Sequence, residues 1–219
     1  RGPSPDGHSA KPDITSQGVA VVAAASGGHG ATAYRSLSGT SMSAPHVAGG
    51  AAIVMQARAD LSPAEVKKVL TSSAVISDEH VLEQGAGAMD INRAITQAVI
   101  AQPNRELGYF GYDQNNDYSE SSVTFENTSN EDITFKLNLD LIGEDGKTQL
   151  PATVAGLGVK SVTVPANGQV DVPIWIEPTV AMRDGAYGAI TGKITGTTVG
   201  GQGEQIVVPV SFWVDQPQV

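Results

Sequence analysis

The sequence predicts a chain of two parts, an α/β layer region followed by an all-β antiparallel sandwich. Residues 1–101 are rich in alanine, serine and glycine and carry helix signals, whereas from about residue 119 apolar residues alternate with polar ones. With 219 residues, 40% of them hydrophobic, the chain is long enough to bury two cores. We therefore predict one domain over residues 1–101, a junction over residues 102–118 and a second domain over residues 119–219.

The helix signals of the first part are local. Ser62 is a favoured helix cap, Pro63 suits the first helical position, and Glu65 completes a capping box. A second helix is predicted to begin at Asp90. Residues 18–25 (G-V-A-V-V-A-A-A) have the composition of a short buried strand. Helices interleaved with such strands indicate an α/β layer architecture.

The second part has the two-residue period of β-strands, with turns rich in glycine, proline and asparagine between the runs. The expected strands are residues 121–126, 132–142, 161–164, 169–176, 189–195 and 205–214. Roughly seven short strands in about 100 residues are typical of an antiparallel β-sandwich.

Charge and composition exclude several classes of function. The net charge of −10 and the pI near 4.7 disfavour nucleic acids and anionic membrane surfaces as partners, because both would repel the chain. The chain has no cysteine, which excludes disulfides and thiolate chemistry. No apolar run approaches the roughly 20 residues of a membrane span, so no span is expected.

The most informative stretch is residues 36–50, S-L-S-G-T-S-M-S-A-P-H-V-A-G-G. Pro45 is tolerated only near a helix N-terminus, so a helix is predicted to begin at about Ser41. The residues that follow offer almost no polar face, and we expect this helix to be buried on nearly all sides. Ser41 would then lie beside unpaired N–H groups that could stabilise an oxyanion. By position alone, Ser41 could equally be a simple helix cap.

Residues 39–49, G-T-S-M-S-A-P-H-V-A-G, resemble the nucleophile motif of the subtilisin-like serine proteases, the subtilases. Every fixed position of the eleven-residue motif matches. Flanking segments agree: R-G-P and K-P-D-I near the start of the chain, and Q-G-A-G-A-M-D over residues 84–90. The resemblance implies that residues 1–101 are the C-terminal portion of a three-layer catalytic domain with a parallel sheet. It also implies that the β-rich part is a fibronectin type III-like domain.

The resemblance implies a role for each motif residue. Ser41 would be the nucleophile that forms an acyl-enzyme, and its backbone N–H would be one oxyanion donor. The vicinity of substrate and oxyanion would comprise Ser36, Leu37, Ser38, Gly39 and Thr40. His46 matches a histidine that is structural in the family, and is not expected to be the catalytic base.

The rest of the triad is not found in the sequence. In the family the order is Asp, His, Ser, and neither an H-G-T-H context nor a D-[ST]-G motif occurs here. The asparagine that donates to the oxyanion is also missing. The expected partner is therefore an N-terminal portion of the same protease, and the substrates are expected to be proteins or peptides. Without a base Ser41 is a poor nucleophile, so this chain alone should be inactive.

The resemblance also implies a secreted or cell-envelope protein, and a reaction that needs no cofactor. Residues 113–117 (D-Q-N-N-D) resemble the start of a calcium loop, but Tyr118 stands where an EF-hand requires glycine. A solvated turn is therefore the favoured interpretation, and a structural calcium site stays open as the alternative. The cluster at residues 77–80 (S-D-E-H) lacks metal-ligand spacing and is expected in a surface loop. Residues 127–129 (N-T-S) match a glycosylation acceptor but also suit a turn.

Two other functions compete with a peptidase. The chain could be a non-catalytic scaffold or binding module, in which a degenerate subtilase half supports the sandwich. Alternatively, the sandwich could be the working part and dock substrate or a wall polymer, although its sequence has no aromatic strip that names a ligand.

Overall fold

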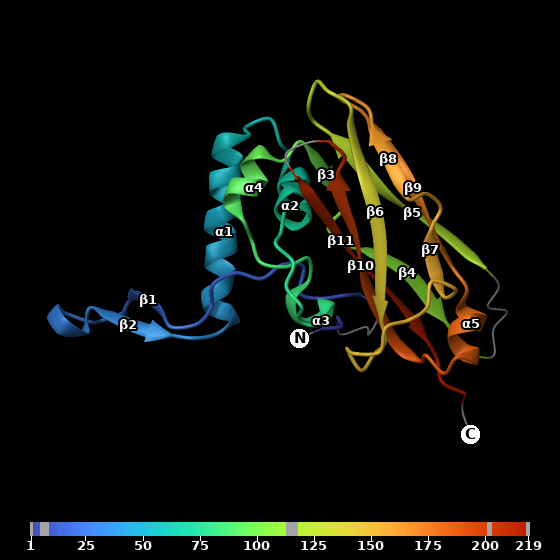
Figure 1. The fold of residues 1–219 in the computed structure, drawn as a ribbon. Coiled ribbons are helices and arrows are strands. Elements are labelled where there is room, and N and C mark those ends of the chain that lie inside the picture. The colour runs from blue at the N-terminus through green and yellow to red at the C-terminus, as the bar shows by residue number, and fades with distance from the viewer. Residues whose placement is uncertain (1, 5–8, 113–117, 201–202, 218–219) are drawn as a thin grey trace.

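The computed structural model describes residues 2–4, 9–112, 118–200 and 203–217, and residues 113–117 of the calcium-loop prediction lie outside them (Figure 1). The first part of the chain contains a small β-hairpin and four helices. In chain order they are β1 (Val21–Ala24), a 3-10 turn (Gly30–Thr32), β2 (Tyr34–Leu37), α1 (Thr40–Ala57), α2 (Pro63–Ser72), α3 (Val81–Gln84) and α4 (Ile91–Thr96).

The caps predicted for two of these helices are confirmed. The Ser62 hydroxyl accepts from the Glu65 N–H, and the Glu65 carboxylate accepts from the Ser62 N–H at 2.7 Å. Pro63 occupies the first position of α2, as expected. Asp90 caps α4 by accepting from the Arg93 N–H at 3.0 Å. Side chains thus satisfy N–H groups that each helix leaves free at its start.

The second part forms two sheets that pack face to face. The five-stranded sheet has the order β4-β11-β10-β6-β8 and the four-stranded sheet the order β3-β5-β9-β7. Their bounds are β3 Val99–Ala101, β4 Arg105–Phe110, β5 Ser119–Asn127, β6 Ile133–Ile142, β7 Ala155–Leu157, β8 Ser161–Val164, β9 Gln169–Ile176, β10 Gly188–Thr198 and β11 Gln205–Val214, with helix α5 at Pro178–Arg183. Phe125 from one sheet and Phe135 and Phe212 from the other are buried in one core. The predicted β-sandwich is therefore confirmed.

Two features of the sandwich differ from the expectation. Strand β4 runs parallel to β11, whereas every other strand pair in the two sheets of the described chain is antiparallel. The sheets also include Val99–Ala101 and Arg105–Phe110, residues that the sequence places at the end of the first domain and in the junction. A parallel partner 105 residues away in sequence leaves no local turn signal, so β4 could not be recognised from its neighbours.

The predicted parallel sheet of the first part is not present among the described residues. Strands β1 and β2 form an antiparallel hairpin, and the parallel pairing described in this part is a single bridge between Thr15 and Ala88. Val22 of β1 is 67% exposed, so the expectation of a buried strand was wrong. In place of the predicted α/β layers, the described residues of the first part form a set of helices and one exposed hairpin.

Helices α2 and α4 join the first part to the sandwich through an apolar core. Val69 of α2 and Ile100 of β3 are both fully buried in this core, together with Val54 of α1 and Ala94 of α4. Polar contacts surround the core. Lys68 pairs with Glu126 of β5 at 3.0 Å, and Arg58 donates to the Thr128 hydroxyl at 2.9 Å.

His80 joins the two parts at a second place. Its Nδ1 accepts from the Leu82 N–H at 3.2 Å, so Nε2 carries the proton and donates to the Thr191 hydroxyl of β10 at 2.9 Å. Ser77–Glu79 are exposed, as a surface loop requires, but His80 is buried. The prediction of a surface loop was therefore wrong for His80, because the sandwich covers its ring.

Asn127 is used by the fold as a turn residue. It is buried, and its side-chain N–H groups donate to the carbonyls of Glu131 and Val164 at 2.7 and 3.1 Å. Its side-chain oxygen accepts from the backbone and hydroxyl of Ser129. These contacts favour the turn interpretation over the glycosylation acceptor.

In the described part of the chain, no helix is long and apolar enough to cross a membrane.

Candidate functional site

Ser41 is the second residue of α1, directly after a sharp connection from β2. Gly39 precedes the helix with φ of 152°, a backbone conformation that residues with a side chain rarely adopt. The Gly39 N–H donates to the Gly18 carbonyl at 2.8 Å, and its own carbonyl accepts from Met42 at 3.0 Å. This geometry explains why glycine stands before the Thr-Ser pair, and it places Ser41 exposed at the start of the helix.

Two backbone N–H groups are available beside the Ser41 side chain. No described group accepts from the N–H of Thr40 or Ser41, as expected for the first turn of a helix. The helix dipole adds partial positive charge at the same end. The start of α1 can therefore stabilise an oxyanion that forms next to the Ser41 hydroxyl.

Hydrogen bonds fix the hairpin against the start of α1. The Ser38 hydroxyl accepts from the Ala20 N–H at 2.9 Å, and the Ser43 hydroxyl donates to the Ser16 carbonyl at 3.0 Å. Gly18 lies so close that an added Cβ would come within 3.0 Å of the Gly39 carbonyl oxygen. Ser36 and Leu37 lie in β2 opposite Val22 and Val21. The structure thus brings Ser36, Leu37, Ser38, Gly39, Thr40 and Ser41 into one continuous exposed segment.

No described residue hydrogen-bonds the Ser41 hydroxyl, and none acts on it as a base. The His46 ring donates from Nδ1 to the Met42 carbonyl at 2.8 Å, one turn back along α1. His29 lies in the hairpin turn and His80 is bound to Thr191. His8 lies outside the described residues. Among the described residues, no histidine is therefore hydrogen-bonded to the Ser41 hydroxyl.

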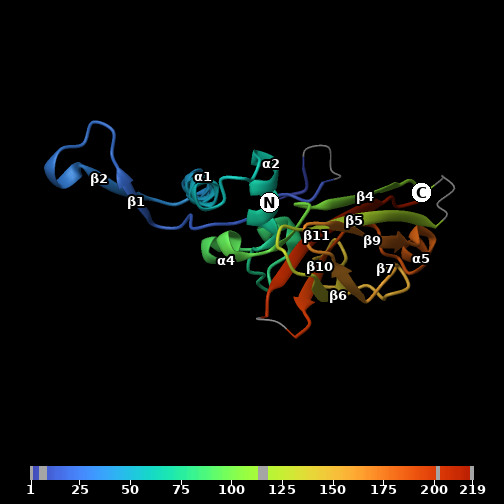
Figure 2. The ribbon, with the colours of Figure 1, turned by 90° about the horizontal axis from the view of Figure 1, so that it is seen from above.

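Helix α1 is largely exposed, which corrects the expectation that it is buried on nearly all sides. Only Gly50 and Val54 are buried among its residues, whereas Ile53 and Met55 are each 49% exposed. The hairpin projects beyond α1, away from the sandwich, in both views (Figures 1 and 2). The small apolar residues of α1 are typical of a buried helix. In the described chain, however, only the side of α1 that packs on α2 and α4 is covered.

We call the exposed large apolar side chains of the hairpin segment and α1, taken together, the uncovered face. It comprises Val19, Val22, Tyr34, Leu37, Ile53 and Met55. Several large apolar side chains left exposed on neighbouring elements favour an interaction site. The uncovered face lies on the β1–β2 hairpin, on Val19 just before it, and on α1, the helix that carries Ser41.

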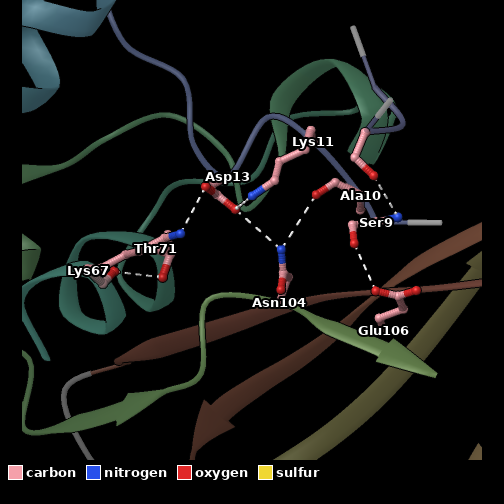
Figure 3. A network of polar contacts seen from close by, with 9 residues as sticks. Ser9, Ala10, Lys11, Asp13, Lys67, Thr71, Asn104 and Glu106 are labelled. Atoms are coloured by element: carbon pink, nitrogen blue, oxygen red, sulfur yellow. Dashed lines mark hydrogen bonds and ion pairs between the residues drawn. The ribbon is translucent and has the colours of Figure 1, made fainter. Parts of the chain in front are cut away.

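Asp13 of the K-P-D-I segment is partly buried and was given no role by the sequence. Its carboxylate contacts the ammonium groups of Lys11 at 2.8 Å and Lys67 of α2 at 3.0 Å, and accepts from Asn104 at 3.3 Å (Figure 3). Burial alone would raise the pKa of Asp13, but the two lysines offset it and lower the pKa below 3.8. The network ties the segment before the hairpin to α2 and to the first residues of the sandwich.

Replacing Asp13 with asparagine is expected to destabilise the protein by about 1–2 kcal/mol at pH 7, because two charge-assisted contacts are lost. The folded-state pKa is lowered, so this contribution is present above the unfolded pKa and is lost as the pH falls through the folded value. Urea unfolding should therefore show a difference between wild type and Asp13→Asn at pH 7 that shrinks below about pH 4. Asp78→Asn, at an exposed loop position, is the control and should change stability little.

Other candidate sites lie away from Ser41. A pocket of about 680 Å³ is bordered by Arg93 of α4, Asp132 before β6 and Glu204 before β11. Among the described residues, no group of three or more histidines and carboxylates could hold a metal ion.

Comparison with known proteins gives relatives along most of the chain. The model of the subtilase family matches residues 1–126. The minor extracellular protease Vpr of Bacillus subtilis is 29% identical over 198 residues, which are 84% of this chain and 25% of that protein. The C5a peptidase of Streptococcus pyogenes is 30% identical over 186 residues, 75% of this chain and 16% of that protein. Subtilisin-like protease SBT1.4 of Arabidopsis thaliana is 35% identical over 108 residues, 44% of this chain and 14% of that protein.

The chain spans a quarter or less of the length of these relatives. Among solved structures, the PapD-like domain 7 of human CEP192 overlays with a TM-score of 0.41 and 15% identity, covering 55% of this chain and 87% of that one. That overlay assigns the sandwich to no particular family. The family match includes Ser41, α1 and the Gly-rich segment at residues 84–90. The chain therefore belongs to the subtilase family and carries part of a subtilase domain.

Proposed function

We propose that this chain supplies the nucleophile Ser41 of a subtilisin-type serine endopeptidase. The observation that carries the proposal is the position of Ser41 at the start of α1, beside the free N–H groups of Thr40 and Ser41, within the family's nucleophile motif. The catalytic Asp, His and oxyanion Asn come from an N-terminal portion of the same protease. The uncovered face is the surface on which that portion packs.

The reaction is acyl transfer in two steps. The base of the partner portion takes the Ser41 proton as the hydroxyl oxygen attacks the peptide carbonyl, and the oxyanion accepts from the Ser41 N–H. The base then gives the proton to the leaving amine, and an acyl ester remains on Ser41. Water activated by the same base hydrolyses this ester and restores the hydroxyl. Ser36, Leu37 and Ser38 border the substrate, and no cofactor takes part.

Several finer features belong to the same proposal. The protein acts outside the cell or at the cell envelope on protein or peptide substrates, as the word extracellular in the name of the Vpr relative suggests. The sandwich is a fibronectin type III-like domain that packs on the catalytic part, supported by the shared cores at α2, β3 and β11.

The competing function is a non-catalytic module. One observation favours it: no described residue hydrogen-bonds the Ser41 hydroxyl. In that case the subtilase part would act only as a support for the sandwich. The two functions differ in whether Ser41 becomes reactive when a subtilase N-terminal portion is present.

Labelling with a fluorophosphonate separates these two functions. The chain alone should label little, because its serine has no base, whereas the complete protease should label stoichiometrically at Ser41. Peptide mass spectrometry identifies the labelled residue. Strong labelling of the chain alone would contradict the proposal that the base comes from another portion of the protease. An absence of labelling in the complete protease would support the non-catalytic module.

A further inference from the structure

The outer face of the four-stranded sheet carries a pair of aromatic side chains. Along β5 the inward residues Val123 and Phe125 are buried, so Glu120 points to the other face, and Tyr118, directly before the strand, has the same parity. Glu120 lies opposite Trp175 of β9. The rings of Tyr118 and Trp175 are 6.3 Å apart between centroids and inclined by 18°, so their planes are nearly parallel.

Trp175 lies against the edge strand β7. A Cβ added at Gly156 would come within 2.5 Å of the indole ring, so glycine is needed for the ring to rest on the strand. Aromatic rings commonly cover a glycine on a neighbouring strand and stabilise a sheet edge. This structural role accounts for Trp175 but not for Tyr118, which extends the aromatic surface and is 49% exposed.

Carboxylates surround the aromatic pair. The Tyr118 hydroxyl donates to the Glu120 carboxylate at 2.6 Å. This hydrogen bond raises the pKa of Tyr118 most, followed by burial and by the charges of Glu120 and Glu177. Strands β5, β7 and β9 contain no lysine or arginine, so no basic residue of these strands neutralises the patch. An aromatic face flanked by carboxylates is complementary to a cation, and most of all to a planar guanidinium.

We propose that Tyr118, Trp175, Glu120 and Glu177 form a binding site for a basic peptide segment, whose arginine or lysine side chain stacks on the aromatic pair and pairs with the carboxylates. The site lies on the sandwich, whereas Ser41 lies on the first part of the chain. The proposal of this site therefore does not rest on the proposed function. The site would hold a basic segment of a substrate or partner protein while leaving Ser41 free.

The test is calorimetric titration of the protein with a pentapeptide of alternating serine and arginine, in the Ser41→Ala background so that cleavage cannot remove the probe. Tyr118→Ala and Glu120→Gln should each weaken binding at least about 5-fold, and 0.5 M salt should weaken it further. Glu131→Gln is the matched control, because it changes an exposed acid away from the patch. This control should bind the peptide as tightly as the parent.

Trp175→Phe keeps a ring over Gly156 and tests the site without exposing the sheet edge. It should bind the peptide more weakly while its thermal unfolding stays close to that of the parent. Two results would overturn the proposal. One is binding of the peptide that none of these substitutions changes. The other is an absence of peptide binding, whether or not a neutral glycan such as cellohexaose binds the patch.

Discussion

Ser41→Ala in the complete protease is expected to lower kcat by about 10⁴- to 10⁶-fold, since loss of the nucleophile of a serine protease triad removes the covalent pathway. The KM should change little, because Ser41 does not carry the binding surface in the proposed site. Hydrolysis of a chromogenic peptide, followed with purified wild type and variant, measures both constants. The folded state should be retained, because Ser41 is exposed and its hydroxyl contacts no described residue.

Ser43→Ala is the matched control for this substitution. Ser43 lies in the same helical turn, but its hydroxyl donates to the Ser16 carbonyl at 3.0 Å and so helps to hold the segment before the hairpin. Its loss should lower kcat less than about 10-fold, as expected for one positioning hydrogen bond. Retained activity in Ser41→Ala, or an equal loss in both variants, would contradict the assignment of Ser41 as the nucleophile.

The residues around Ser41 show which parts of a site can be predicted from sequence. The position of the serine at a helix start follows from Pro45 and from the small residues that surround it, and the structure places the start of α1 at Thr40. The burial of α1 does not follow from the sequence. An apolar composition indicates that a helix can be buried, but it does not indicate which part of a protein covers it. Of the residues of α1, only Gly50 and Val54 are buried by the described chain.

The fold shows the same division between local and distant information. Strands β8, β9 and β11 begin and end where the two-residue period predicts, and the capping box of α2 is present in full. Strand β7 was not predicted, because Ala-Gly-Leu is a poor strand sequence and pairs only where Trp175 covers Gly156. The stacking of Tyr118 on Trp175 was also missed, because the two rings meet only through the pairing of β5 with β9, which lie far apart in sequence.

The glycines at residues 85 and 87 show what a family motif requires physically. Gly85 has φ of +62°, and a Cβ added there would lie 2.5 Å from the Asp13 carbonyl oxygen and also collide with the Pro12 carbonyl. Gly87 has φ of +125°, and its Cβ would meet the backbone of Val75. The Q-G-A-G segment therefore lies between two other backbone segments, at distances that leave no room for a side chain.

Gly85→Ala is accordingly expected to destabilise the protein by at least about 3 kcal/mol, because the backbone of residues 12–13 would have to move as well as the backbone at position 85. Urea unfolding measures this loss, and the Asp13 contacts with Lys11 and Lys67 should be disturbed with it. Gly185→Ala is the matched control: Gly185 also has a positive φ, +76°, but its Cβ would meet nothing within 4 Å. The control isolates the conformational cost, about 1 kcal/mol. Equal destabilisation in the two variants would show that backbone conformation alone, and not the close approach of the K-P-D-I segment, makes glycine necessary at position 85.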